Sequence, residues 1–94
     1  ALLQKVEQRR VYNSYIDHLG HVNNVRYSEF AYDTLSDAEV ENYRNMKRMD
    51  IFFKSEMRVN DVFDMMKSNV RGRIVTRGYN ETKSDVSFDI VFGF

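Results

Sequence analysis

The sequence predicts an α+β domain in which one antiparallel β-sheet of about five strands wraps around a central α-helix. Three observations lead to this fold class. Apolar residues recur with the period of two that is typical of strands over most of residues 49–94. The period of a helix is clear in only one long stretch, which begins near residue 24. The connections between the last strands are short, which favours antiparallel neighbours in a meander.

The first part of the chain predicts a strand, a turn and then that helix. Residues 5–16 alternate apolar and polar side chains well enough for a strand, and the polar residues 17–21 follow as a turn. Asn23 or Asn24 is placed to cap the start of the helix. The apolar stripe of the helix has the spacing i, i+3, i+4, i+7, i+8 and consists of Tyr27, Phe30, Ala31, Thr34 and Leu35.

A second, shorter helix is predicted next, because Ser36 and Glu39 have the spacing of a capping box. We expect it to continue to about Arg44. In the strand that follows, alternation places Glu56 on the face opposite Met57. Four strands joined by tight turns complete the chain, and they are predicted at residues 49–59, 62–70, 74–79 and 86–94.

Size and composition indicate one small domain over residues 1–94. Its 14 basic residues balance 14 acidic ones, whereas nucleic-acid-binding proteins usually carry a basic excess, so no nucleic-acid partner is expected. Because cysteine is absent, thiolate metal sites and cysteine nucleophiles are excluded. No apolar run reaches the ~20 residues of a membrane span, and no signal peptide is visible. We therefore expect a cytoplasmic protein without a membrane partner.

Residues that can support chemistry concentrate just before the long helix. Asp17 and His21 have a spacing that allows a carboxylate–imidazole pair. Gly20 permits a positive φ or a close approach of the main chain. Asn23 and Asn24 add side-chain amides at a helix start, whose free N–H groups suit an anion or a polarised carbonyl oxygen. This segment is therefore the candidate binding or catalytic site.

The same residues allow two other interpretations, a capping loop without function and a metal site. Polar residues before a helix often form only a capping loop, and surface histidines need no function. His18 and His21 lack the i, i+4 spacing of a helical metal pair, and no cysteine supplements them, so neither a metal nor a cofactor is expected.

The run YIDHLGHVNNVRY at residues 15–27 resembles the signature of hotdog-fold thioesterases, and within them that of the acyl-acyl carrier protein (acyl-ACP) thioesterases. The family pattern is Asp-x-Asn-x-His-Val-Asn-Asn-x-x-Tyr in the second of two tandem hotdog domains. It is followed by a strand with a glutamate before a Gly/Asn-Asp turn. Glu56 and the turn at Asn60-Asp61 match that glutamate and its turn. The resemblance extends from about Arg10 to Phe94 and implies a hotdog fold.

The resemblance implies hydrolysis of an acyl-ACP or acyl-CoA thioester, releasing a fatty acid in fatty acid biosynthesis. Glu56 would act as general base or nucleophile, and Asp17 would orient His21 or act with it. We expect His21 and Glu56 to open onto one cleft. The substrate-binding residues carried over from the motif are Gly20, Asn23, Asn24, Val25 and Tyr27.

One residue departs from the family pattern, because Leu19 stands where the family has its middle asparagine. This departure supports an alternative, a non-catalytic hotdog domain that binds an acyl chain or mediates assembly. A second alternative is a hotdog hydratase or dehydratase, since the interval from Asp17 to His21 is close to one used there. Those enzymes usually have Asn-Pro before the histidine, and this sequence contains no proline.

The chain is also expected to have partners. A domain of this size buries a smaller fraction of its unfolded surface than larger domains do, and Phe52 and Met66 fall on strand faces opposite the main apolar set. We therefore expect a homodimer, or pairing with a second hotdog domain of a longer tandem protein. An acidic carrier protein would favour basic docking patches. Two basic groups are candidates for such a patch, Arg71, Arg73 and Arg77 in one and Arg44, Lys47 and Arg48 in the other.

Overall fold

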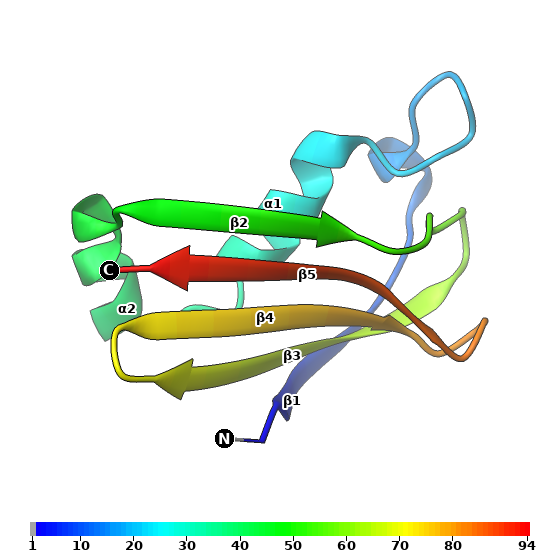
Figure 1. Cartoon of the computed structure of the whole chain (residues 1–94). Helices are drawn as coiled ribbons and strands as arrows, with labels where there is room; N and C mark the ends of the chain where they lie inside the picture. Colours follow the sequence, from blue (N-terminus) through cyan, green and yellow to red (C-terminus); the bar gives the residue numbers. More distant parts are fainter. Residues whose placement is uncertain (1) are drawn as a thin grey trace.

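The computed structural model describes residues 2–94 and has one five-stranded antiparallel sheet with a helix against one face (Figure 1). The strand order is β1-β3-β4-β5-β2, and α1 (Asn24–Tyr32) is the helix that the sheet wraps. The expected α+β class is confirmed. The strands are β1 (Gln4–Arg10), β2 (Arg48–Phe53), β3 (Val62–Val70), β4 (Arg73–Asn80) and β5 (Asp85–Gly93). No helix within residues 2–94 is long and apolar enough to cross a membrane.

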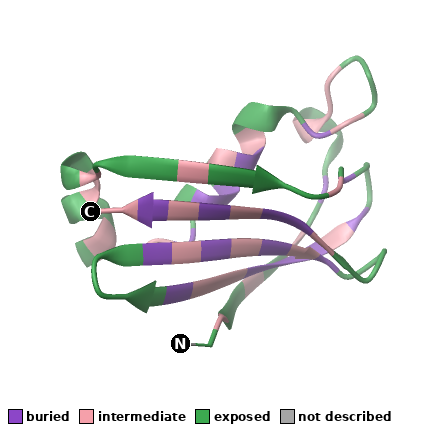
Figure 2. Ribbon diagram, in the orientation of Figure 1, coloured by how far each residue is buried: buried purple, intermediate pink, exposed green. Residues whose placement is uncertain are grey.

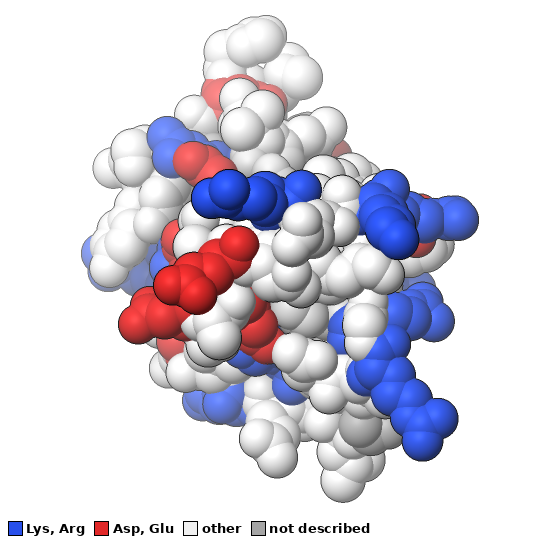
Figure 3. All heavy atoms as spheres, turned by 90° about the vertical axis from the view of Figure 1, so that its left-hand side faces the viewer, with Lys and Arg blue, Asp and Glu red and all other residues white. Residues whose placement is uncertain are grey.

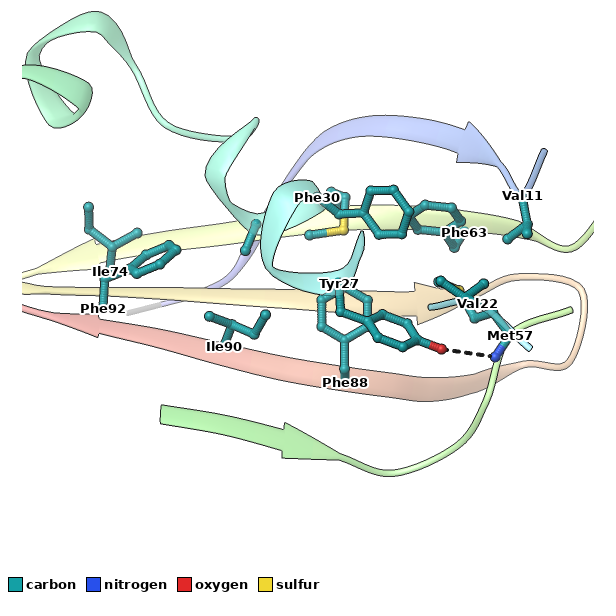
Figure 4. Close-up of a cluster of buried hydrophobic side chains, with 12 residues drawn as sticks. Val11, Val22, Tyr27, Phe30, Met57, Phe63, Ile74, Phe88, Ile90 and Phe92 are labelled. Carbon is teal, nitrogen blue, oxygen red and sulfur yellow. Dashed lines mark hydrogen bonds between the residues drawn. The ribbon is translucent and has the colours of Figure 1, made fainter. Parts of the chain in front are cut away.

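The core lies between α1 and the inner face of the sheet, where buried and less buried residues alternate along β4 and β5 (Figure 2). Three residues of the predicted stripe, Tyr27, Phe30 and Ala31, are buried as expected, whereas Thr34 and Leu35 lie beyond the end of the helix. Tyr27 packs its ring on Phe88 at 4.8 Å between centroids. The buried apolar residues drawn in Figure 4 are Val11, Val22, Tyr27, Phe30, Ala31, Met57, Phe63, Met65, Ile74, Phe88, Ile90 and Phe92.

The predicted first strand is too long. β1 ends at Arg10, because the next residue bonds the turn that precedes β3 and not the strand itself: Val11 N–H donates to Asp61 C=O at 2.8 Å, and Asn60 N–H donates to Val11 C=O at 2.9 Å. The chain then tightens into the 3-10 helix η1 (Asn13–Tyr15). The contact with Asn60 and Asp61 places the loop before α1 next to the segment that follows β2.

The predicted strand over residues 49–59 is also too long, and its neighbour differs from the expected one. β2 ends at Phe53, because Lys54 N–H and Ser55 N–H both donate to the carbonyl of Ser87, at 2.8 and 3.1 Å, and the regular ladder stops there. Only β3, β4 and β5 form a meander. β2 instead pairs with the far side of β5, and this pairing makes it an edge strand. Glu56 therefore lies in a loop and not on a strand face.

Both α-helices begin at caps that the sequence predicts. Asn23 is the N-cap of α1, and its side chain accepts the Val25 N–H at 3.0 Å. Ser36 and Glu39 form the predicted capping box at the start of α2 (Asp37–Asn42). This helix is shorter than expected, because the chain continues from Asn42 as the 3-10 helix η2 (Tyr43–Asn45).

Glu39 also anchors α2 to the sheet. Its carboxylate accepts a hydrogen bond from Lys67 Nζ at 2.7 Å and one from the Asn69 side chain. Lys67 Nζ donates as well to the Thr34 carbonyl at 2.8 Å. Burial alone would raise the pKa of Glu39, but the hydrogen bonds from Lys67, the Ser36 N–H and Asn69 outweigh it and lower the pKa to about 2.

This lowered pKa predicts an acid-dependent contribution to stability. Because the folded-state pKa lies below the unfolded value, the contribution is complete above about pH 4.5 and is lost as the pH falls towards 2. We expect Glu39→Gln to lower the free energy of unfolding by about 1–3 kcal/mol at neutral pH. Urea unfolding at several pH values measures the difference, with exposed Glu41→Gln as the control. An equal Glu39→Gln effect at pH 7 and near pH 2 would contradict the assignment.

Candidate active site

The loop before α1 is a tight turn closed by its own main chain. Asp17 N–H donates to the carbonyl of His21 at 2.9 Å, and Ile16 and Val22 form an isolated antiparallel bridge. Gly20 has a φ of 82°, a conformation that glycine adopts without strain. These contacts hold His21 at the base of the loop, directly before the helix cap.

Asp17 does not pair with the imidazole, so this part of the prediction is wrong. Its Oδ1 instead accepts the main-chain N–H groups of Leu19, at 2.9 Å, and of His21, at 3.3 Å. The short side chain of an aspartate commonly bonds to the main chain two residues on in this way. In this structure Asp17 therefore shapes the loop that carries His21.

Glu56 is the carboxylate that lies beside the imidazole. Its Oε2 is 3.2 Å from His21 Nε2, and both side chains are partly exposed, 60% for Glu56 and 30% for His21. The neighbouring residues explain this approach, because Val22 N–H donates to the carbonyl of Met57 at 3.4 Å. The expected convergence of His21 and Glu56 is therefore observed, although Glu56 reaches the site from a loop.

His21 and Glu56 open onto one pocket of about 380 Å³ beside the start of α1. Its lining combines apolar side chains with two acids and an imidazole. Its lining residues are Asp17, Leu19, His21, Val22, Asn24, Tyr27, Phe53, Lys54, Ser55 and Glu56. A separate hollow of about 490 Å³ contains none of the candidate catalytic residues. Its Arg9 and Arg26 are already paired with Asp33 and Glu29.

The start of α1 offers fewer free donors than expected. The Val25 N–H is bound by the Asn23 side chain, and the Asn23 N–H donates to the carbonyl of Tyr15 at 2.9 Å. The N–H of Asn24 has no acceptor within residues 2–94, and Asn24 lines the pocket. Among Asn23, Asn24 and Val25, the N–H of Asn24 is the one without an acceptor within residues 2–94.

Three of the predicted substrate-binding residues have other positions. Gly20 and Asn23 shape the loop and the helix cap and are not part of the pocket lining, and the Val25 side chain is exposed. Tyr27 touches the pocket but is 3% exposed. Its hydroxyl oxygen accepts the Met57 N–H at 3.3 Å, as the dashed line in Figure 4 shows.

Sequence reasoning missed Phe53, Lys54, Ser55 and the buried Ser87. The first three line the pocket because β2 ends at Phe53 and the chain then leaves the sheet beside the pocket. The prediction of a longer strand did not indicate this. Ser87 is covered by the segment after β2, and nothing in the sequence around Ser87 indicates this cover. Within the part of the chain described, no group of three or more His, Cys, Asp or Glu side chains is placed to hold a metal ion.

Solved structures share this fold. An acyl-ACP thioesterase from Bacteroides thetaiotaomicron superposes with a TM-score of 0.83 at 23% identity, over 97% of this chain and 37% of that chain. The hypothetical protein SAV2348 from Staphylococcus aureus, solved in complex with CoA, has a TM-score of 0.74 at 17% identity, with 99% and 80% covered. The probable thioesterase YbaW from Escherichia coli has a TM-score of 0.71 at 19% identity, with 92% and 77% covered. The fold is therefore the hotdog fold of thioesterases.

The sequence itself identifies the family. No curated protein matches it. The model of the acyl-ACP thioesterase C-terminal domain, however, matches residues 3–91, which is nearly the whole chain. The chain spans little more than a third of the Bacteroides thioesterase with which it superposes. This protein belongs to the family of acyl-ACP thioesterase C-terminal domains, within the hotdog-fold thioesterases.

Proposed function

We propose that this domain hydrolyses acyl thioesters and that His21 and Glu56 are its catalytic pair. The contact of 3.2 Å between the imidazole and the carboxylate, which both line a pocket beside a helix start, is the observation that carries the proposal. A carboxylate held against an imidazole is suited to proton transfer. The family match supports the choice of a thioester as the substrate class.

In the reaction, the Glu56 carboxylate takes a proton from water as the water oxygen attacks the thioester carbonyl carbon. The negative charge that develops on the carbonyl oxygen is stabilised by the free N–H of Asn24, a contribution of about 3 kcal/mol for one donor of this kind. The C–S bond then breaks, and the leaving thiolate takes the proton from Glu56. The His21 imidazole orients Glu56 and the water, and Asp17 orients His21 through the loop.

The substrate we propose is a fatty acyl thioester of acyl carrier protein or CoA, and the product is a free fatty acid in fatty acid biosynthesis. Leu19, Val22 and Phe53 are apolar residues of the pocket that His21 and Glu56 also line. These side chains suit an alkyl chain near the thioester. The CoA complex of the Staphylococcus protein supports a pantetheine thioester, since that protein has the same fold.

The basic groups expected to dock a carrier do not adjoin the pocket. Lys47, Arg48, Arg71 and Arg73 line a groove near the start of β2 and the turn between β3 and β4. These segments lie at the end of the sheet away from the loop before α1 (Figure 1). Figure 3 faces that end of the molecule, and it shows acidic as well as basic side chains there. Arg77 is already bound to Asp89, at 2.8 and 3.0 Å. A carrier that reaches this chain's own pocket therefore needs another surface.

Substitution of the catalytic pair tests the proposed function directly. We expect His21→Gln and Glu56→Gln each to lower kcat/KM for acyl-thioester cleavage by about 100-fold or more, since each removes a group that acts on the proton in transit. His18→Gln is the matched control, because His18 is exposed three residues from His21. The measurement is thiol release from acyl-CoA and acyl-ACP of several chain lengths. Hydrolysis that survives both substitutions would place the chemistry elsewhere.

Leu19 provides a second test. It lies 65% exposed in the loop, lines the pocket and cannot donate a hydrogen bond. If an amide at this position assists the reacting group, Leu19→Asn increases turnover by about 10-fold or more, because such donors are typically worth 100- to 1000-fold. Initial rates of thioester cleavage measure the change. If the parent and Leu19→Asn both fail to release thiol while an acyl ligand binds, the domain is an acyl-binding module and not an enzyme.

We also propose that the domain pairs with a second hotdog domain through β2. This edge strand leaves one side of its main chain unpaired within the sheet and exposes Ile51, Phe52 and Phe53, which are 38%, 52% and 52% exposed. Proteins rarely leave such an edge free. We expect light scattering to give twice the chain mass of 11.2 kDa, and Phe52→Asp to shift the protein to the monomer. A stable monomeric parent at micromolar concentration would contradict this.

A further inference from the structure

Glu56 is held in the site by its two neighbours. The main chain of Glu56 itself makes no hydrogen bond within residues 2–94. The residue before it and the residue after it are both fixed to buried groups of the core. The direction of the Glu56 side chain therefore depends on how firmly Ser55 and Met57 are held.

On one side, Ser87 of β5 fixes Ser55 through two contacts. The carbonyl of Ser87 accepts the Ser55 N–H at 3.1 Å, and the Ser87 hydroxyl donates to the carbonyl of Ser55 at 2.7 Å. Ser87 is fully buried. A buried hydrogen bond of this kind is costly to break, because it leaves a carbonyl without a partner and away from water.

On the other side, the Tyr27 hydroxyl accepts the N–H of Met57, which is fully buried. Burial raises the pKa of Tyr27, and the hydrogen bond from the Met57 N–H and the nearby Ser87 hydroxyl partly offset this rise. The Tyr27 hydroxyl therefore stays protonated at neutral pH and stands beside Ser87. Tyr27 thus bonds the main chain directly after Glu56, and Ser87 bonds the main chain directly before it.

We propose that Tyr27 and Ser87 are positioning residues, which hold the Glu56 carboxylate against the His21 imidazole by fixing the main chain of Ser55 and Met57. This proposal rests on the proposed catalytic role of Glu56. It assigns Tyr27 a function that differs from substrate contact, because its polar atom bonds to the main chain of the Glu56 loop. It also assigns a function to Ser87, which lies outside the motif before α1.

Conservative variants test this role. Tyr27→Phe keeps the ring in the core and removes only the hydroxyl, and Ser87→Ala removes the other hydroxyl from the opposite side. The matched control is Thr76→Val. Thr76 is fully buried and its hydroxyl donates to the Ile90 carbonyl at 2.8 Å, but this contact lies within β4 and β5 and away from Glu56. Thermal melting shows whether the three variants are equally folded.

We expect Tyr27→Phe and Ser87→Ala to lower kcat for thioester cleavage by about 10- to 100-fold while KM changes by less than about twofold, because a small displacement of a catalytic group slows chemistry more than binding. Thr76→Val leaves kcat unchanged. Equal kcat losses in all three variants would indicate a general loss of stability and would overturn the proposal.

A second readout does not depend on activity. We expect the NMR signals of the His21 ring to move in Tyr27→Phe and Ser87→Ala in the direction in which Glu56→Gln moves them, and to stay in place in Thr76→Val. If Glu56→Gln shifts these signals and neither hydroxyl variant does, the positioning role is overturned, whatever the rates. If the parent cleaves no thioester, the proposed function fails, and the ring signals still decide whether Tyr27 and Ser87 hold Glu56 in place.

Discussion

The hydrogen bond from the Met57 N–H to the Tyr27 hydroxyl connects the core to the loop that carries Glu56. The ring of Tyr27 belongs to the core, where it packs on Phe88 and on Phe53. Its oxygen reaches the loop after β2, which has no helix or strand of its own to hold it. The other hydrogen bonds that hold this loop come from Ser87, from Asp61 and from the Val22 N–H, which donates to the Met57 carbonyl.

Packing in the core fixes the position of the Tyr27 ring and therefore of its hydroxyl. Gly78 in β4 leaves room for the Phe88 ring, since a Cβ at that position would collide with it. Phe88 in turn supports Tyr27. On the far side of the loop, the buried carboxylate of Asp61 accepts the Arg58 N–H and the side-chain amide of Asn80, both at 2.9 Å. The partly exposed residues of the site are thus held by buried ones.

The sequence predicted helix starts and strand alternation correctly where these depend on residues close together in the chain. The Asn23 cap, the capping box at Ser36 and the alternation of β5 all depend on neighbours within a few residues. The end of β2 and its pairing with β5 could not be predicted in this way. Both depend on where Ser87 lies in space, about thirty residues further along the chain.

In the candidate site, too, the sequence predicted local features better than contacts between distant residues. The motif before α1 located His21, and the resemblance located Glu56, but the spacing of Asp17 and His21 suggested the wrong partner for the imidazole. Spacing along the chain does not give the direction of a side chain in a turn, and here the Asp17 carboxylate turns inward to its own loop. Ser87 and the hydroxyl of Tyr27 act through the main chain, so no pattern of reactive residues points to them.

A double-substitution cycle on His21 and Glu56 tests the central claim, that these two side chains act as one catalytic unit. The values of kcat/KM for acyl-thioester cleavage are measured for the parent, His21→Gln, Glu56→Gln and the double variant. Residues that act as a unit are strongly non-additive, so the double variant should be no slower than the slower single variant. Losses that multiply in the double variant would show that the two residues act independently and would contradict the account.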